Sequence, residues 1–138
     1  MKTIKKVILF SSILMVLSCE KRNDSIINDP DKLIGYWINP LGNDTILTFQ
    51  KASALKDNDY GFAFKKDSGF VERKIARGCG TPPISYADFE GSWIRNDSLI
   101  SITTSYWGGS VNYQWIIISL DNNQLKIHKL KEEYHIKE

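Results

Sequence analysis

Apolar and polar residues alternate with a period of two along most of this chain. The segments 47–50, 60–65 and 125–128 each place apolar side chains at every second position, with polar or small residues between them. Alternation among β-branched and aromatic residues predicts strands, whereas helices would show a period of 3.6. Clusters of Gly, Pro, Asn and Asp separate the alternating segments and predict turns.

Eight strands are expected between these turns. They cover residues 34–39, 45–51, 60–66, 69–76, 88–95, 98–105, 111–120 and 124–130. Most connections are short, so neighbouring strands should pair as antiparallel hairpins. We therefore expect an all-β fold, an eight-stranded antiparallel up-and-down barrel. One short helix is expected over 28–33, with Asp29 as its cap and Pro30 in its first position.

The first nineteen residues carry the three parts of a secretory signal. Three lysines precede the apolar run 7–17, and the small residue Ser18 stands directly before Cys19. The run is shorter than the stretch of about 20 apolar residues that crosses a membrane. Its ending, Val-Leu-Ser-Cys, resembles the bacterial lipobox. This resemblance implies cleavage before Cys19 and acylation of that residue, with palmitate among the expected chains; a secreted protein with a chance cysteine is the alternative.

A lipidated Cys19 would divide the chain into a signal peptide (1–18), a lipidated tether (19–32) and one barrel domain (33–138). Two or more acyl chains anchor a protein stably, so a membrane is the expected partner. We expect the outer membrane, because nothing in the polar segment 20–31 resembles an inner-membrane retention signal. Cleavage leaves 15 basic and 16 acidic residues. This balance gives no reason to expect nucleic-acid binding, which needs a clustered basic face.

The start of the expected barrel resembles the lipocalin-like, or calycin, domains of bacterial lipoproteins. Gly35 and Trp37 form that family's Gly-x-Trp motif on the first expected strand. The resemblance implies that Trp37 plugs one end of the barrel and that Gly35 lets the strand bend beside it. The family usually packs a late arginine against this tryptophan, but no Arg follows Arg95. We expect a lysine to replace it through a cation–π contact; the candidates are Lys126, Lys129 and Lys131.

A second Gly-x-Trp occurs at Gly91 and Trp93, again followed by an Asn-Asp turn. The repetition indicates either two duplicated four-strand halves or two unrelated hairpins built from common turn residues.

Aromatic residues beside glycines mark the first candidate binding site. Tyr106 and Trp107 precede two glycines at an expected hairpin tip, which is a poor position for core residues. With Tyr113 and the 78–83 loop, they are expected to form the rim of a ligand site in the barrel mouth. The alternative is that Trp107 folds back over an open barrel end.

Charged residues on the fourth expected strand allow two interpretations. Glu72, Arg73, Lys74 and, at the end of the strand, Arg77 indicate a solvated edge that discourages strand addition. Alternatively, Arg73 and Arg95 offer bidentate donors to an anionic ligand.

Other residues carry weaker chemical signals. Cys79 lacks a recognisable catalytic base, so we expect a buried structural thiol rather than a nucleophile. Two distant histidines and one further cysteine do not give a metal-ligand spacing, and no cofactor is expected. Asp-Ser/Thr-aliphatic triplets at Ser25, Thr45 and Ser98 are similar to a bacterial O-glycosylation sequon, although the same pattern also leads turns into strands.

Together these features favour a non-enzymatic lipoprotein that binds a small, partly apolar ligand. The alternative is a barrel filled by its own side chains, which acts as a structural or protein-interaction module of the cell envelope. Eight-stranded barrels are compatible with both, because their interior is just wide enough for side chains or for one small ligand.

Overall fold

The computed structural model describes residues 30–77 and 82–138. The predicted signal peptide, Cys19, the tether up to residue 29 and Ser25 lie outside the described residues. So do Cys79 and most of the 78–83 loop. The expectations that rest on these residues remain predictions.

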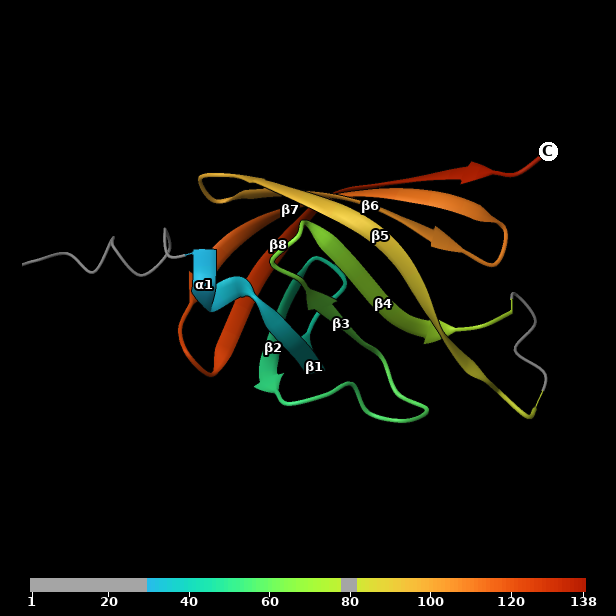
Figure 1. The fold of residues 1–138 in the computed structure, drawn as a ribbon, viewed down its shortest axis with the longest axis horizontal. Coiled ribbons are helices and arrows are strands. Elements are labelled where there is room, and N and C mark those ends of the chain that lie inside the picture. Colours follow the sequence, from blue (N-terminus) through green and yellow to red (C-terminus); the bar gives the residue numbers. More distant parts are fainter. Residues whose placement is uncertain (1–29, 78–81) are drawn as a thin grey trace, which may run out of the picture.

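The described residues form an all-β fold in which eight antiparallel strands close into a barrel, as the sequence predicts (Figure 1). A single turn of helix, α1 (Pro30–Leu33), precedes the barrel. The strands are β1 (Gly35–Gly42), β2 (Ile46–Ala52), β3 (Gly61–Phe64), β4 (Gly69–Ile75), β5 (Tyr86–Asn96), β6 (Leu99–Tyr106), β7 (Gly109–Leu120) and β8 (Gln124–Ile136). The eighth strand continues six residues beyond its predicted end at residue 130.

The strand order departs from a simple meander at the first hairpin. Around the barrel the order is β1-β2-β8-β7-β6-β5-β4-β3, so β1 lies between β2 and β3. Compared with a simple meander, the two strands of the β1–β2 hairpin have exchanged places. The strand that pairs with β8 is therefore β2 rather than β1. The connection 53–60 must carry the chain past β1 to reach β3, whereas the remaining consecutive strands pair as predicted.

Contacts on the outside of the barrel hold this crossing connection. The side chains of Leu55 and Ile38 meet over Gly61, where an added Cβ would lie 3.0 and 3.2 Å from them. Arg73 Nη1 donates to the carbonyl of Lys56 at 3.1 Å. The same guanidinium forms a bidentate pair with Asp88, at 2.6 and 2.8 Å. Arg73 thus joins the connection to β4 and β5.

Helix α1 closes one end of the barrel. Leu33 and Trp37 are completely buried, and the indole Nε1 of Trp37 donates to the carbonyl of Leu33 at 2.8 Å. Lys51 lies over the indole ring, with Nζ 5.2 Å from its centroid. A lysine does contact the tryptophan, but it comes from β2 rather than from β8. Gly35 has a φ of +131°, and an added Cβ would lie 2.9 Å from Lys51 Cε, so this position requires glycine.

Aromatic rings fill the interior next to this closed end. Phe62 is fully buried and contacts five other rings, with centroid separations between 4.7 and 6.5 Å; these rings belong to Phe49, Tyr60, Phe64, Phe70 and Trp115. Trp93 packs edge-on against Phe64, and its Nε1 donates to the carbonyl of Lys65 at 3.1 Å. The closed half of the barrel is therefore packed with side chains.

The two Gly-x-Trp hairpins do not mark duplicated halves. Successive antiparallel pairings from β1 through β3 and β4 to β5 make β1 and β5 run in opposite directions. β2 is followed by the crossing connection, whereas β6 leads directly into its partner β7. The environments also differ, because Ile38 is buried while Ile94 is 70% exposed. The repeat reflects two hairpins with similar turn residues.

Candidate ligand-binding site

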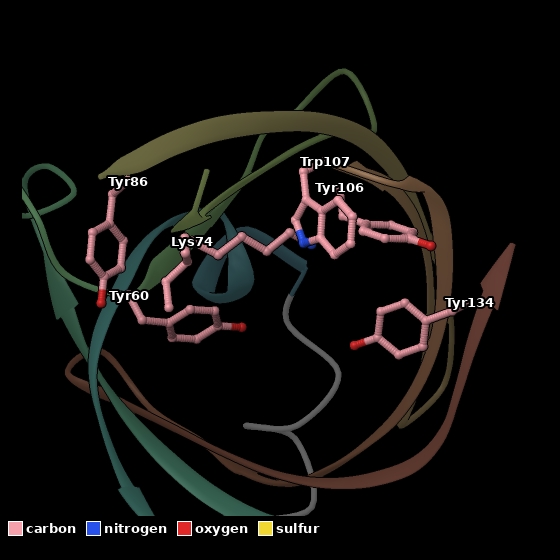
Figure 2. A pocket seen from close by; sticks show the side chains of 7 residues that line it. Tyr60, Lys74, Tyr86, Tyr106, Trp107 and Tyr134 are labelled. Carbon is pink, nitrogen blue, oxygen red and sulfur yellow. The ribbon is translucent and has the colours of Figure 1, made fainter. Parts of the chain in front are cut away.

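The end of the barrel opposite α1 is open and contains a cavity of about 310 Å³. Its walls come from β4, β5, β6, β8 and the residues that flank β3 and β7. The lining residues are Tyr60, Lys74, Ile75, Tyr86, Tyr106, Trp107 and Tyr134 (Figure 2). A neighbouring space of about 480 Å³ shares Tyr60, Lys74 and Tyr134 with it and reaches down to Tyr113 and Trp115. These two spaces form one open mouth.

Tyrosines dominate the mouth. Five of the six tyrosines of the chain line the two spaces, and the sixth, Tyr36, lies on β1 outside them. The hydroxyls of Tyr60 and Tyr134 point towards each other across the cavity (Figure 2). Such walls combine apolar ring faces with hydrogen-bonding hydroxyls, which suits a partly apolar molecule.

A buried carboxylate forms the floor of the mouth. Glu72 is only 1% exposed, and its oxygens accept hydrogen bonds from three side chains. Tyr60 donates from its hydroxyl to Oε1 at 2.8 Å, Tyr113 donates to Oε2 at 3.1 Å, and Lys74 Nζ lies 2.6 Å from Oε2. A buried charge is tolerated only when it is paired and hydrogen-bonded, and this carboxylate meets both conditions.

Lys74 lies between this carboxylate and the cavity. Its Nζ also donates to the hydroxyl of Tyr113 at 3.3 Å. The ammonium lies 5.3 Å from the ring centroid of Phe89 and 5.8 Å from that of Tyr113, within cation–π range. These contacts hold the lysine head at the cavity surface rather than in bulk solvent.

The tyrosines beside Glu72 stay protonated far into the alkaline range. Burial raises the pKa of Tyr60 well above its ordinary value, and the nearby Glu72 carboxylate raises it further. The pKa of Tyr113 rises for the same two reasons, in the same order. Burial also raises the pKa of Tyr134, with Glu132 adding to the effect. At neutral pH these three hydroxyls are therefore neutral groups that donate and accept hydrogen bonds.

Two of the aromatic residues singled out in the sequence, Tyr106 and Trp107, lie at the edge of the cavity. Tyr106 contacts Trp107 and Tyr134 edge-on, with centroid separations of 5.7 and 5.3 Å. Trp107 is 61% exposed at the β6–β7 turn and borders the cavity instead of sealing it. Tyr113 lies deeper, on the floor. The structure thus brings Tyr106, Trp107 and Tyr113 to one site.

The two predicted arginines lie elsewhere. Arg73 is on the outer face, where it is paired with Asp88 and borders a shallow polar depression. Arg95 lies near the β5–β6 turn, towards the α1 end, and its Nε donates to the carbonyl of Asp97 at 2.6 Å.

Gly91 and Trp93 lie on β5, the strand that also carries Arg95. An added Cβ at Gly91 would lie 2.2 Å from the carbonyl oxygen of Thr103, which shows how closely β5 and β6 approach.

Sequence reasoning missed Glu72 and Lys74 as site residues. The solvated-edge interpretation is wrong for them, because β4 has partners on both sides and Glu72 is buried. The sequence did contain a signal for this burial. Glu72 and Lys74 follow Phe70 by two and four positions, so all three side chains lie on the same face of β4. Tyr60, Tyr86 and Tyr134 were also missed, since they come from segments that only the barrel brings together.

Glycosylation candidates remain at turns. Thr45 is exposed between β1 and β2, where its hydroxyl and amide contact Asn43 Oδ1 at 3.1 and 3.0 Å. Ser98 lies in the β5–β6 turn.

Among the described residues, no group of three or more His, Cys, Asp or Glu side chains is arranged to hold a metal ion. No helix in 30–77 or 82–138 is both long and apolar enough to cross a membrane.

Comparison with family models, curated proteins and solved structures finds no match to this chain.

Proposed function

We propose that this protein is a lipid-anchored, lipocalin-like lipoprotein of the outer membrane that binds a small, partly apolar ligand in the barrel mouth. The observation that carries the proposal is the open cavity of about 310 Å³ with tyrosine and tryptophan walls. Its volume lies at the lower end of the range for small-molecule sites. The packed half of the barrel offers the rigid support that such a site needs.

The position of the anchor fits this function. Pro30 lies only eleven positions after Cys19 and starts α1, which closes the end of the barrel opposite the mouth. An acylated Cys19 would therefore attach the membrane near the closed end. The mouth lies at the other end of the barrel from this attachment.

Native mass spectrometry tests the binding proposal. The chain 20–138, which lacks the lipidated cysteine and keeps α1, is purified gently from its own host. We expect an added mass that is lost on denaturation. The same preparation of Trp107→Ala should carry less of that mass, whereas Ile94→Ala, an exposed apolar control on the outer face, should carry as much as the wild type. A bare polypeptide mass that does not change on adding envelope extract would contradict the proposal.

A protein-interaction role is the second candidate. It is favoured by the apolar side chains exposed on the same rim, where Trp107 is 61%, Tyr134 56% and Ile136 81% exposed. Exposed aromatic residues of this kind often anchor protein interfaces. Crosslinking on intact cells would then join this rim to one envelope protein, and Trp107→Ala would abolish the crosslink. An unchanged crosslink would exclude the rim as the contact.

A further inference from the structure

We propose that the ligand is a compact aromatic or cyclic molecule that carries one anionic group, and that Lys74 binds this group. The inference rests on the proposed binding function and specifies the chemistry of the same site. Two independent features support it: the Lys74 ammonium lines the 310 Å³ cavity whereas the Glu72 carboxylate lines only the neighbouring space, and the packed interior limits the depth of the site.

The charge that a ligand meets in the 310 Å³ cavity is positive. Lys74 is the one charged residue among the seven that line the 310 Å³ cavity. Its partner Glu72 is covered, since the exposed fractions of the two side chains are 18% for Lys74 and 2% for Glu72. The pair is therefore a dipole with its positive end towards the cavity.

Lys74 also retains a donor for a ligand. An ammonium has three N–H groups. In the part of the chain that the structure describes, Glu72 Oε2 and the Tyr113 hydroxyl take two of them. The third remains for the cavity, whose other possible donors are the hydroxyls of Tyr86, Tyr106 and Tyr134 and the indole N–H of Trp107. A carboxylate, sulfonate or phosphate oxygen would accept from the lysine and from a phenol hydroxyl together, and charge-assisted hydrogen bonds of this kind are the strong ones.

The other charges of the mouth do not reverse this preference. Lys129 and Glu132, in the neighbouring space, neutralise each other at 2.7 Å. Asp44 lies on the exposed turn between β1 and β2. Glu72 already accepts hydrogen bonds from two tyrosines and one lysine, so it has little capacity left for a cationic ligand.

The depth of the site argues against a long acyl chain. Directly beneath the floor, Trp115 stacks on Tyr113 with a centroid separation of 5.4 Å, and its ring also contacts Phe62. Phe62 and Phe70 are at most 1% exposed. An extended chain entering the barrel would have to displace these rings. A compact ring system can instead remain between the tyrosines and Trp107 at the mouth.

A matched pair of fluorescent probes tests the anionic group. N-phenyl-1-naphthylamine is neutral, and 8-anilinonaphthalene-1-sulfonate has the same ring skeleton with one sulfonate. At pH 7 we expect the chain 20–138 to bind the sulfonate probe about tenfold more tightly than the neutral probe. A charge-assisted hydrogen bond commonly provides a difference of this size. Lys74→Met should remove this difference and leave the neutral probe's Kd unchanged. Lys126→Met, the same substitution on an outward-facing β8 position, should preserve it.

Glu72→Gln gives a prediction of opposite sign. Loss of the carboxylate leaves the Lys74 charge uncompensated, so the sulfonate probe should bind several-fold more tightly, whereas a site that recognises cations through Glu72 would bind it no better. If Lys74→Met does not fold because Glu72 loses its partner, the double variant E72Q/K74M replaces it. That double variant should bind both probes equally.

Competition tests the compact shape. 1-Naphthoate should displace the bound sulfonate probe, and hexadecanoate below its micellar concentration should not. Displacement by hexadecanoate alone would overturn the compact-ligand inference. Equal Kd values for the two probes in the wild type would overturn the anionic inference while the binding function stands. Failure of both probes to bind would count against the proposed function itself.

Discussion

Lys51 and Trp37 form a contact that joins three elements at the closed end of the barrel. Lys51 Nζ lies 5.2 Å from the centroid of the Trp37 ring and donates to the carbonyl of Lys32 at 2.7 Å. Trp37 in turn donates to the carbonyl of Leu33. The two side chains therefore hold α1 against β1 and β2, and the end of the barrel depends on both.

Replacing Trp37 with alanine should lower the free energy of unfolding by about 3–5 kcal/mol, as expected for truncation of a fully buried large aromatic side chain. Urea denaturation monitored by circular dichroism measures this change. Trp37→Phe keeps a ring but loses the hydrogen bond to Leu33, so it should cost less than the alanine variant. An unchanged denaturation midpoint in Trp37→Ala would show that this residue does not support the closed end.

Trp107→Ala should separate binding from stability. The side chain is 61% exposed, so its removal should change the free energy of unfolding by no more than about 0.5 kcal/mol. Binding of the neutral naphthylamine probe should weaken severalfold, because one aromatic wall of the cavity is lost. Thermal melts and fluorescence titrations on the same samples check the two expectations. A large loss of stability with unchanged binding would reverse the assignment of Trp107 to the rim.

The Arg73–Asp88 pair should make stability depend on acidic pH. The hydrogen bond from Arg73, aided by its charge, holds the pKa of Asp88 below its usual value. Its contribution to stability is therefore present above the unfolded-state pKa of about 4 and is lost as the pH falls through the lower folded-state value. In urea titrations the destabilisation caused by Asp88→Asn should be largest at neutral pH and should decrease as the pH falls below the unfolded-state pKa. Asp57→Asn, at a fully exposed partner of Arg73, should show a smaller effect.

Tyr60 should make the free energy of unfolding depend on alkaline pH, whereas Asp88 acts at acidic pH. Its folded-state pKa is raised by burial and by Glu72, so its contribution to stability is complete below the unfolded-state pKa of about 10 and declines as the pH rises above it. Absorbance titration at 295 nm of the folded protein up to pH 10.5 should give the same amplitude for Tyr60→Phe as for the wild type, because Tyr60 has not ionised. A smaller amplitude in the variant would show that Tyr60 titrates normally.

The strands were predictable because their signal is local. In a barrel strand with one buried face, alternate residues must be apolar, and segments such as 125–128 show this directly. The reversed insertion of the first hairpin was not predictable, since it depends on which distant strand accepts β2. Its partner residues in β8 carry no local mark of that choice. The contact between Lys51 and Trp37 was missed for the same reason.

The site was half predictable. Tyr106 and Trp107 stood out because large aromatic residues beside glycines at a turn are unlikely to be core residues. Glu72 and Lys74 did not, because charged residues on a strand usually face solvent. Their burial becomes understandable only when Tyr60 and Tyr113, from other strands, supply the hydrogen bonds that a buried carboxylate requires.

The position of β2 in the barrel also bears on the order in which the chain is made and folded. Phe49 of β2 pairs with Leu125 of β8, 76 residues further along, so β2 acquires its last partner only when the last strand of the barrel is available. Strands β3 to β8 can pair successively with near neighbours, which is the faster kind of contact to form. If these pairs form first, the amino-terminal hairpin would enter between the two ends of this sheet and close it. Until then both edges of the sheet would be exposed, and exposed edges promote pairing with other chains.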